Sequence, residues 1–368
     1  MHMAVDPNPR EDPHEAAAAG TTTELPMPTA TPQQPIHPGF GRHTTAAEAI
    51  AGVDLRGRTA VVTGAYSGLG HEVARVLVAA GAHVVAPARR VDEARRALAD
   101  LPGVEIAALD LMDPASIDAF AAGIVSSRRP LHLLVHGAAI MASPLLRDAR
   151  SHEAQFSTNH LGHFQLALRL WPALRRAGGA RIVAVSSRGH QRSAVDFDDV
   201  DFERRPYERW SAYGQSKTAN ALFAVGADAR GRADGIRAFA VHPGSILTNL
   251  TRHLSLQDLQ AVGLRDENGE VPATKRDHYK TVPEGAATIA WCAAGTALHG
   301  LGGVYCEDLD IAAVVDRPSP TGVCRYAIDP ALADRLWTLS ESLTGARLAS
   351  SSGRMRLMTT TFSKPSTP

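Results

Sequence analysis

The sequence has few cysteines, no long apolar run and no net charge. Its 368 residues include three cysteines, and Cys292, Cys306 and Cys324 are scattered, odd in number and without a C-x-x-C pair. This pattern argues against both a disulfide framework and a zinc site, and it favours a reducing, cytoplasmic setting. No run of about 18 apolar residues occurs, so no transmembrane helix is expected. The formal net charge of zero gives no sign of a nucleic-acid or membrane-surface partner.

The two ends of the chain differ in composition from its middle. Residues 1–45 are rich in Pro, Ala and Thr and poor in large apolar side chains, so they are expected to form a disordered arm. The acids and prolines of this region also argue against a signal peptide. A flexible tail is expected over residues 349–368. The 46–348 segment between them, in a chain that is 44% hydrophobic, is long enough for one large α/β domain.

Within that middle segment, apolar runs alternate with helical patterns. The alternation is typical of βαβ units and predicts a doubly wound parallel sheet of about seven strands in a single α/β domain. The predicted strands are 59–63, 83–86, 105–109, 131–135, 181–186, 237–241 and 303–306. The predicted helices are 72–80, 92–100, 116–126, 153–176 and 211–230.

A glycine-rich turn, T-G-A-Y-S-G-L-G, joins the first strand to the first helix. Glycines permit a tight turn and a close backbone approach to a phosphate, which a helix N-terminus attracts. The spacing is G-x-x-x-G-x-G, which differs from the commoner G-x-G-x-x-G. A turn of this kind can be purely structural, but its place between a strand and a helix favours a cofactor site. The candidate contacts are Gly64, Ser67, Gly68, Leu69 and Gly70.

The second strand ends in A-R-R, with no acid before Asp92. An NAD site usually places an acid near this position, about 20 residues after the glycines, whereas a guanidinium suits the 2′-phosphate of NADP. Arg89 is therefore the candidate for this phosphate, and Arg90 is interpreted as a solvated charge. Asp110 and Leu111, after the third strand, are candidate contacts for the adenine end, although Asp110 could equally cap the next helix.

Tyr213 and Lys217 are separated by one helical turn in the run S-A-Y-G-Q-S-K-T-A-N. A phenol has a pKa near ~10, and a cation at i+4 on the same helix face favours the phenolate. This spacing is what a tyrosine acid/base requires. A packed ring and a solvated charge are the ordinary alternatives for these two residues.

With these motifs together, the chain resembles the short-chain dehydrogenase/reductase family, and most closely its retinol-dehydrogenase-like and protochlorophyllide-reductase-like branch. S-T-N-H-L-G-H-F (157–164), R-I-V-A-V-S-S-R-G-H (181–190) and V-H-P-G-S-I-L-T-N-L (241–250) carry the resemblance. It implies a Rossmann-type fold, NADP as cofactor, a small carbonyl or alcohol substrate, and Tyr213 as the acid/base. The roles that it implies for other residues are a ribose contact for Lys217, carbonyl orientation by Ser187, a water held by Asn159, and nicotinamide contacts at Pro243, Gly244 and Thr248.

One segment departs from the family pattern. H-G-A-A (136–139) stands where the family has Asn-Asn-Ala-Gly, so Gly137 replaces an asparagine and should leave a backbone group unpaired or bonded to water, unless His136 has taken over the bond. Two other functions remain open: reduction of an activated C=C bond, and non-catalytic nucleotide binding. A homodimer through the helices 153–176 and 211–230 is a further expectation from the resemblance.

Overall fold

In the computed structural model, residues 30–251, 254–274 and 279–348 are described. The central sheet has eight strands in the order β10-β9-β6-β5-β4-β1-β2-β3. Seven of them are parallel, and β10 pairs with β9 in the antiparallel direction. The strands of this sheet are β1 (Thr59–Thr63), β2 (His83–Ala88), β3 (Glu105–Ala108), β4 (Leu133–His136), β5 (Ala180–Val185), β6 (Ile236–His242), β9 (Val304–Glu307) and β10 (Asp310–Ile311). The predicted doubly wound parallel sheet is therefore confirmed, with one antiparallel edge strand added.

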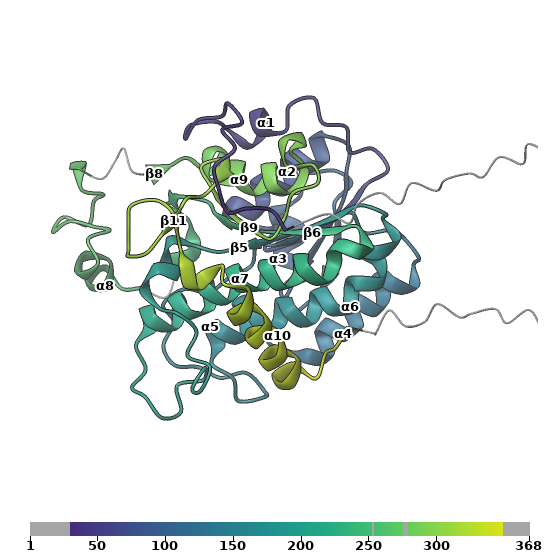
Figure 1. Ribbon diagram of the computed structural model, residues 1–368. Coiled ribbons are helices and arrows are strands. Elements are labelled where there is room, and N and C mark those ends of the chain that lie inside the picture. Colours follow the sequence, from purple (N-terminus) through teal and green to yellow (C-terminus); the bar gives the residue numbers. More distant parts are fainter. Residues whose placement is uncertain (1–29, 252–253, 275–278, 349–368) are drawn as a thin grey trace, which may run out of the picture.

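Helices cover both faces of this sheet. In Figure 1, α1, α2 and α9 lie above the sheet, and α4, α6, α7 and α10 lie below it. The helices are α1 (Ala46–Ala49), α2 (Gly68–Ala79), α3 (Val91–Ala97), α4 (Pro114–Ser126), α5 (Ala154–Phe156), α6 (Gly162–Arg176), α7 (Arg209–Gly231), α8 (Leu256–Ala261), α9 (Val282–Ala294) and α10 (Pro330–Thr344). Short 3-10 turns occur at Arg188–Arg192, Arg232–Asp234, Asn249–Thr251, Thr296–Leu298 and Arg325–Ala327. Two small parallel pairs lie outside the sheet: β7 (Ser245–Ile246) with β8 (Tyr279–Lys280), and β11 (Val314–Val315) with β12 (Val323–Cys324).

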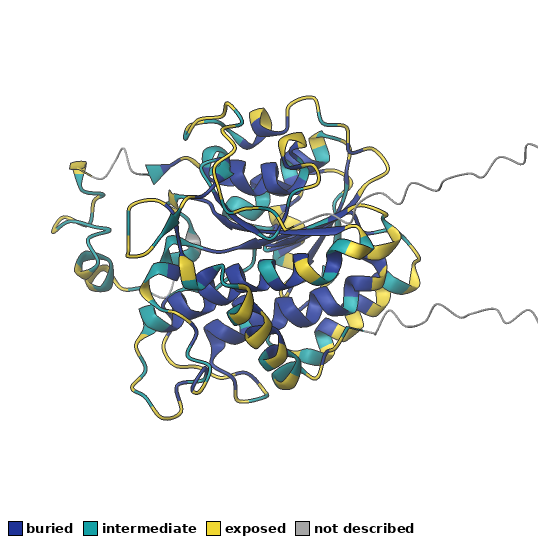
Figure 2. Cartoon of the chain, viewed as in Figure 1, coloured by how far each residue is buried: buried dark blue, intermediate teal, exposed yellow. Residues whose placement is uncertain are grey.

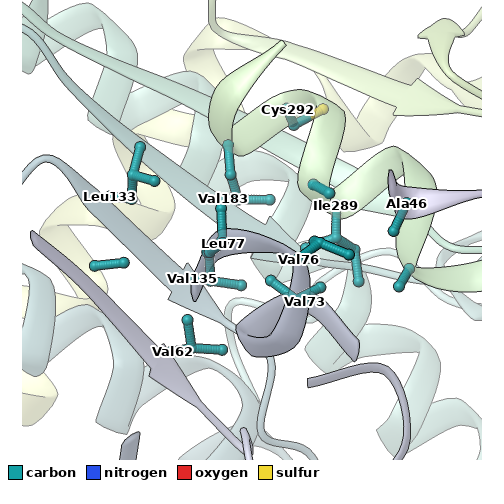
Figure 3. Packing of buried hydrophobic residues seen from close by; sticks show 14 of the residues in the cluster. Ala46, Val62, Val73, Val76, Leu77, Leu133, Val135, Val183, Ile289 and Cys292 are labelled. Atoms are coloured by element: carbon teal, nitrogen blue, oxygen red, sulfur yellow. The ribbon is translucent and has the colours of Figure 1, made fainter. Parts of the chain in front are cut away.

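The core consists of two apolar layers, one on each side of the sheet. Parallel strands that are covered on both faces are apolar throughout, and β1 and β6 are buried along their whole length. Above the sheet, side chains of α2 and α9 such as Leu77 and Ile289 meet Val135 and Val183 (Figure 3). Figure 2 shows the sheet and the inner helix faces as the buried part of the molecule. The carboxyl ends of the strands, where the predicted motifs lie, are thus held on a rigid frame.

The C-terminal helix α10 was not predicted, and it packs on the outer side of α7. It begins after Asp329, whose carboxylate accepts the first amides of the helix, with Pro330 at the first helical position. Trp337 of α10 is 4% exposed and stacks parallel to Phe223 of α7, while Phe164 of α6 meets its ring edge-on. The helices predicted to form a dimer face are therefore partly covered within the chain.

The predicted disordered arm over 1–45 does not hold for its last third. Residues 30–45 lie along the edge of the sheet, where the Gln33 amide bonds three backbone groups: it donates to the carbonyls of Tyr305 and Ala312 and accepts the amide of Tyr305. His43 adds a bond to Glu284 at the start of α9. This segment has few apolar side chains, but it is held against the domain by hydrogen bonds to backbone groups. Residues 1–29 and the predicted tail at 349–368 lie outside the described residues.

Candidate active site

A cavity of about 610 Å³ opens at the carboxyl ends of the strands. This is where parallel α/β sheets bind their ligands, beside the point at which the strand order reverses. In this sheet the reversal lies between β1 and β4. Most of the candidate residues line the cavity: Gly64, Ser67, Gly68, Leu69, Gly70, Arg89, Gly137, Ser187, Tyr213, Lys217, Pro243, Gly244 and Thr248.

The glycine-rich turn forms one wall of this cavity. Gly64 and Gly68 have φ angles of 75° and 52°, in the left-handed region that favours glycine, and a Cβ on Gly70 would overlap the carbonyl oxygen of Gly64. The helix was predicted to begin at residue 72, but α2 begins at Gly68, so Gly68 and Gly70 form its first turn. The Ser67 side chain makes no capping bond to that turn. The first amides of α2 thus remain available to an anion.

Arg89 and Arg90 stand where β2 reaches the cavity. Arg89 is exposed and makes no hydrogen bond or ion pair among the described residues. Arg90, interpreted from the sequence as a solvated charge, also lines the cavity and pairs with Glu93 at 2.9 Å. Of the two arginines, Arg89 is therefore the one whose charge is not matched by a described acid.

Three predicted site residues, Asp110, Leu111 and Asn159, do not line the cavity. The Asp110 carboxylate accepts the amide of Met112 at 3.0 Å, so it stabilises its own turn. Leu111 is buried, with its backbone against Gly162. Asn159 lies in a π-helical turn, Ser157–Leu161, and its side chain bonds the backbone of Ile140 and the hydroxyl of Ser216. The adenine contact of Asp110 stays a prediction.

Ser187, Tyr213 and Lys217 come together at the end of β5. Helix α7 places Tyr213 and Lys217 on one face, with the lysine Nζ 5.6 Å from the centre of the tyrosine ring. Lys217 Nζ also donates to the carbonyl of Val185 at 2.9 Å. Gly189 lets the ring approach, since a Cβ there would lie 2.8 Å from Tyr213 Cε1. The arrangement is that of a proton donor with a hydroxyl and an amine at its side.

Burial shifts the pKa values of these groups in directions that the sequence does not reveal. Desolvation raises the pKa of Tyr213 to about 12, and a hydrogen bond from Ser187 opposes this rise. Desolvation lowers the pKa of Lys217 to about 7. The lowering of the tyrosine pKa by Lys217 that was expected from their spacing is not among the causes of this shift, and the phenol, with its pKa raised, is protonated at neutral pH.

The floor of the cavity shows how the chain does without the family asparagine. The Thr63 hydroxyl accepts the amides of Gly137 (3.0 Å) and Ala138 (3.1 Å), so neither backbone group is left unpaired, contrary to expectation. His163 lies 2.8 Å from the same hydroxyl through Nε2, and its Nδ1 lies 3.1 Å from the carbonyl of Asn159. His136 has not taken over the bond: its Nε2 is buried and unpaired, and its ring stacks on His163 at 4.5 Å.

Sequence reasoning missed the other side of the cavity. Arg188 follows Ser187 directly, so its position was a usable signal. Met141, Arg265 and Tyr279 line the cavity from loops and short strands that carry no motif. No motif or hydrophobic period in the sequence marks Met141, Arg265 or Tyr279 as a cavity residue.

The chain matches the family model for short chain dehydrogenase over residues 58–259. It belongs to the short-chain dehydrogenase/reductase family. A probable oxidoreductase of Streptomyces antibioticus is 47% identical over 77% of this chain and 97% of its own length. Human retinol dehydrogenase 12 is 35% identical over 80% of the chain and 89% of its own length, in line with the resemblance to the retinol-dehydrogenase-like branch.

Solved structures agree with this assignment. An uncharacterised protein from Mycobacterium paratuberculosis has 31% sequence identity and a TM-score of 0.63, covering 82% of this chain and 98% of its own chain. A carbonyl reductase from chicken fatty liver, solved with NADPH bound, has 21% identity and a TM-score of 0.53 over 72% of this chain and 97% of its own. The second likeness concerns the fold alone. Among the described residues of the chain, no helix is long and apolar enough to cross a membrane.

Proposed function

We propose that this short-chain dehydrogenase transfers hydride between NADP(H) and a carbonyl or alcohol substrate, with Tyr213 as the acid/base. The observation that carries the proposal is the meeting of Ser187, Tyr213 and Lys217 in the cavity that the glycine-rich turn also lines. A nucleotide-binding protein without catalysis has no use for a buried tyrosine beside a lysine. Family membership supports an oxidoreductase in general.

The residues present fit a dinucleotide that carries a 2′-phosphate. The first turn of α2 offers unpaired amides next to glycines whose missing Cβ atoms leave room for a pyrophosphate. Arg89 supplies a cation that pairs with none of the described residues, and the sequence has no acid at the end of β2 to bond a free ribose hydroxyl. Lys217, Pro243 and Gly244 would hold the nicotinamide half. When bound, this cofactor supplies the hydride-transfer chemistry that no side chain can provide.

Tyr213 and Ser187 provide the proton-transfer part of the proposed reaction. With a pKa of about 12, Tyr213 is protonated at neutral pH, so its hydroxyl can donate a proton to a carbonyl oxygen as that oxygen becomes negative. Ser187 bonds the same oxygen and shares the developing charge. In the opposite direction the phenol must first lose its proton. We therefore expect carbonyl reduction at neutral pH and alcohol oxidation that speeds up as the pH rises.

The test is turnover by the purified full-length chain. NADPH and NADH are each offered with a panel of aldehydes and ketones, and the decrease in absorbance of the reduced nicotinamide is followed. Tyr213→Phe removes the proton donor and little contact area, so kcat should fall at least about a hundredfold while the Kd for NADPH stays within about twofold. A Tyr213→Phe variant that keeps most of its activity would show that another group donates the proton.

A further inference from the structure

The cavity extends past Tyr213 to an end that lies far from Arg89. Arg89 follows β2 and Ser187 follows β5, and three interstrand spacings of about 4.8 Å place them roughly 14 Å apart. Arg188 lies further on, because its backbone amide donates to His242 Nδ1 at the end of β6. Tyr279 belongs to β8, which pairs with β7 directly after β6. Arg188 therefore lines the cavity away from Arg89, and Tyr279 lines it from β8.

Two guanidinium groups and a phenol at this end have unused hydrogen-bond donors. The Arg188 side chain has a buried Nε without a partner and makes no hydrogen bond or ion pair with the described residues. Arg265 donates from Nη1 to its neighbour, the carbonyl of Leu264. The Tyr279 hydroxyl is buried without a partner. Burial raises the pKa of Tyr279 and the charge of Arg265 opposes that rise, which places Arg265 close to the phenol.

No carboxylate on the cavity wall matches these charges. Among the described residues that line the cavity, Glu93 is the single acid, and it pairs with Arg90 at the far end. Behind the wall, Glu307 accepts the amide of Gly322, and Asp308 pairs with the buried Lys280. Glu307 is near enough to Arg188 for the two charges to interact, and burial raises the pKa of its carboxyl, but Glu307 does not line the cavity. The cavity side of this end is thus positive.

We propose that Arg188, Arg265 and Tyr279 bind a carboxylate of the substrate. The substrate would be a carbonyl compound, or the corresponding alcohol, whose carboxylate is separated from the reacting carbon by an apolar part. Guanidinium groups bind carboxylates through short, charge-assisted hydrogen bonds, and such a ligand would satisfy donors that are otherwise costly to bury. Met141, Leu247 and Leu259 line the same cavity and offer contacts for the apolar part. This inference rests on the proposed function, since it names the substrate class for that site.

The test compares two aldehydes that differ in one charge. 4-Formylbenzoate and its methyl ester share the ring and the reacting aldehyde. With NADPH and the full-length protein, we expect kcat/KM for the acid to exceed that for the ester by about ten- to hundredfold. Arg188→Gln and Arg265→Gln should each reduce this ratio at least about fivefold, mainly through KM for the acid. Arg265→Lys, which keeps the charge but not the fork of donors, should retain part of the preference.

A matched control and a binding measurement separate the possible failures. Arg169→Gln alters an arginine of α6 that pairs with Asp118 outside the cavity, and it should leave the ratio unchanged. In melting experiments without turnover, benzoate should stabilise the protein more than benzamide does, and this difference should disappear in the Arg188→Gln/Arg265→Gln variant. Binding of benzoate that depends on these arginines, without turnover of any aldehyde, supports the carboxylate site and overturns the proposed reaction. Equal kcat/KM for acid and ester, or a preference that survives both arginine variants, overturns the carboxylate site.

Discussion

Gly137 occupies a place on the cavity floor where the fold leaves no room for a side chain. An ideal Cβ at this position would lie 2.7 Å from the carbonyl oxygen of Thr63, a backbone atom of β1 that pairs with the end of β4. Carbon and oxygen atoms do not approach this closely without a bond, so Gly137→Ala must push two central strands apart. The side chain of an asparagine at this position would begin with the same Cβ and would meet the same oxygen.

The cost of the substitution can be worked from that contact. Adding a methyl group to a packed interior typically costs about 1–3 kcal/mol in the free energy of unfolding. The amides of Gly137 and Ala138 would also move relative to the Thr63 hydroxyl that accepts them. For domains at the upper end of the usual size range, each kcal/mol corresponds to about 2 °C in Tm. We therefore expect Gly137→Ala to lower Tm by about 2–6 °C, and Gly137→Asn by at least as much.

Gly123 provides the matched control. It lies in the last turn of α4, and a Cβ there would meet no atom within 4 Å. Because alanine is favoured over glycine in a helix by up to about 1 kcal/mol, Gly123→Ala should leave Tm unchanged or raise it. Thermal unfolding followed by circular dichroism on the three variants decides the matter. A Gly137→Ala or Gly137→Asn protein that melts at or above the parent temperature would refute the packing argument.

Three further predictions follow from other parts of the molecule. Arg89→Ala should reduce the NADPH:NADH ratio of kcat/KM about ten- to hundredfold. Arg95→Ala, on the outer surface of α3, is the control and should not change this ratio. An unchanged ratio in Arg89→Ala would contradict the 2′-phosphate role. Burial lowers the pKa of His163 from 6.5 to about 3, so between these pH values the unfolded chain binds more protons than the folded chain. The neutral buried His163 therefore contributes its full stabilisation above pH 6.5. This stabilisation is lost as the pH falls toward 3, by up to about 1.4 kcal/mol in the free energy of unfolding per pH unit. Urea unfolding at pH 7 and pH 5 should then show a smaller loss in His163→Gln than in the parent, and equal losses would count against this assignment. Deletion of residues 1–45 should lower Tm relative to deletion of residues 1–29, because it removes the three bonds of Gln33 to the sheet edge; equal melting temperatures would show that this contact is not stabilising.

The strands could be predicted closely because the local sequence states their role. The central parallel strands are buried on both faces, so they appear as apolar runs, and β1 was predicted with the bounds that it has. Helix α9 was missed for the opposite reason. It is rich in alanine and buried on nearly all sides, so it shows no amphipathic period by which a helix is identified. Helix α10 did have a helix-start pattern in its sequence, an N-cap Asp329 followed by Pro330, but this pattern lies beyond the last predicted strand.

The site divides in the same way. Residues fixed by chemistry and spacing, such as Tyr213 with Lys217 and the glycines before α2, converge on the cavity as predicted. The pKa of Tyr213 could not be predicted from spacing, because it depends on how deeply the fold buries the ring. Asp110 could not be placed either. An acid after a strand can face a ligand or accept a backbone amide of its own turn. The choice depends on whether such an amide lies within reach, and here the amide of Met112 does and bonds the Asp110 carboxylate.

The two terminal segments bear on the homodimer, which stays a prediction. Helices α6 and α7 were expected to form its face, but α10 lies against α7, and its Trp337 is inserted among Phe164 and Phe223. A partner copy could reach these rings only by displacing a tryptophan that is 4% exposed, which would expose one of the largest apolar side chains of the core. Near the β10 edge of the sheet, Gln33 of the segment 30–45 bonds β9. A dimer through α6 and α7 must therefore take in α10, and a dimer through the β10 edge must take in the segment 30–45, because the chain itself already packs on both.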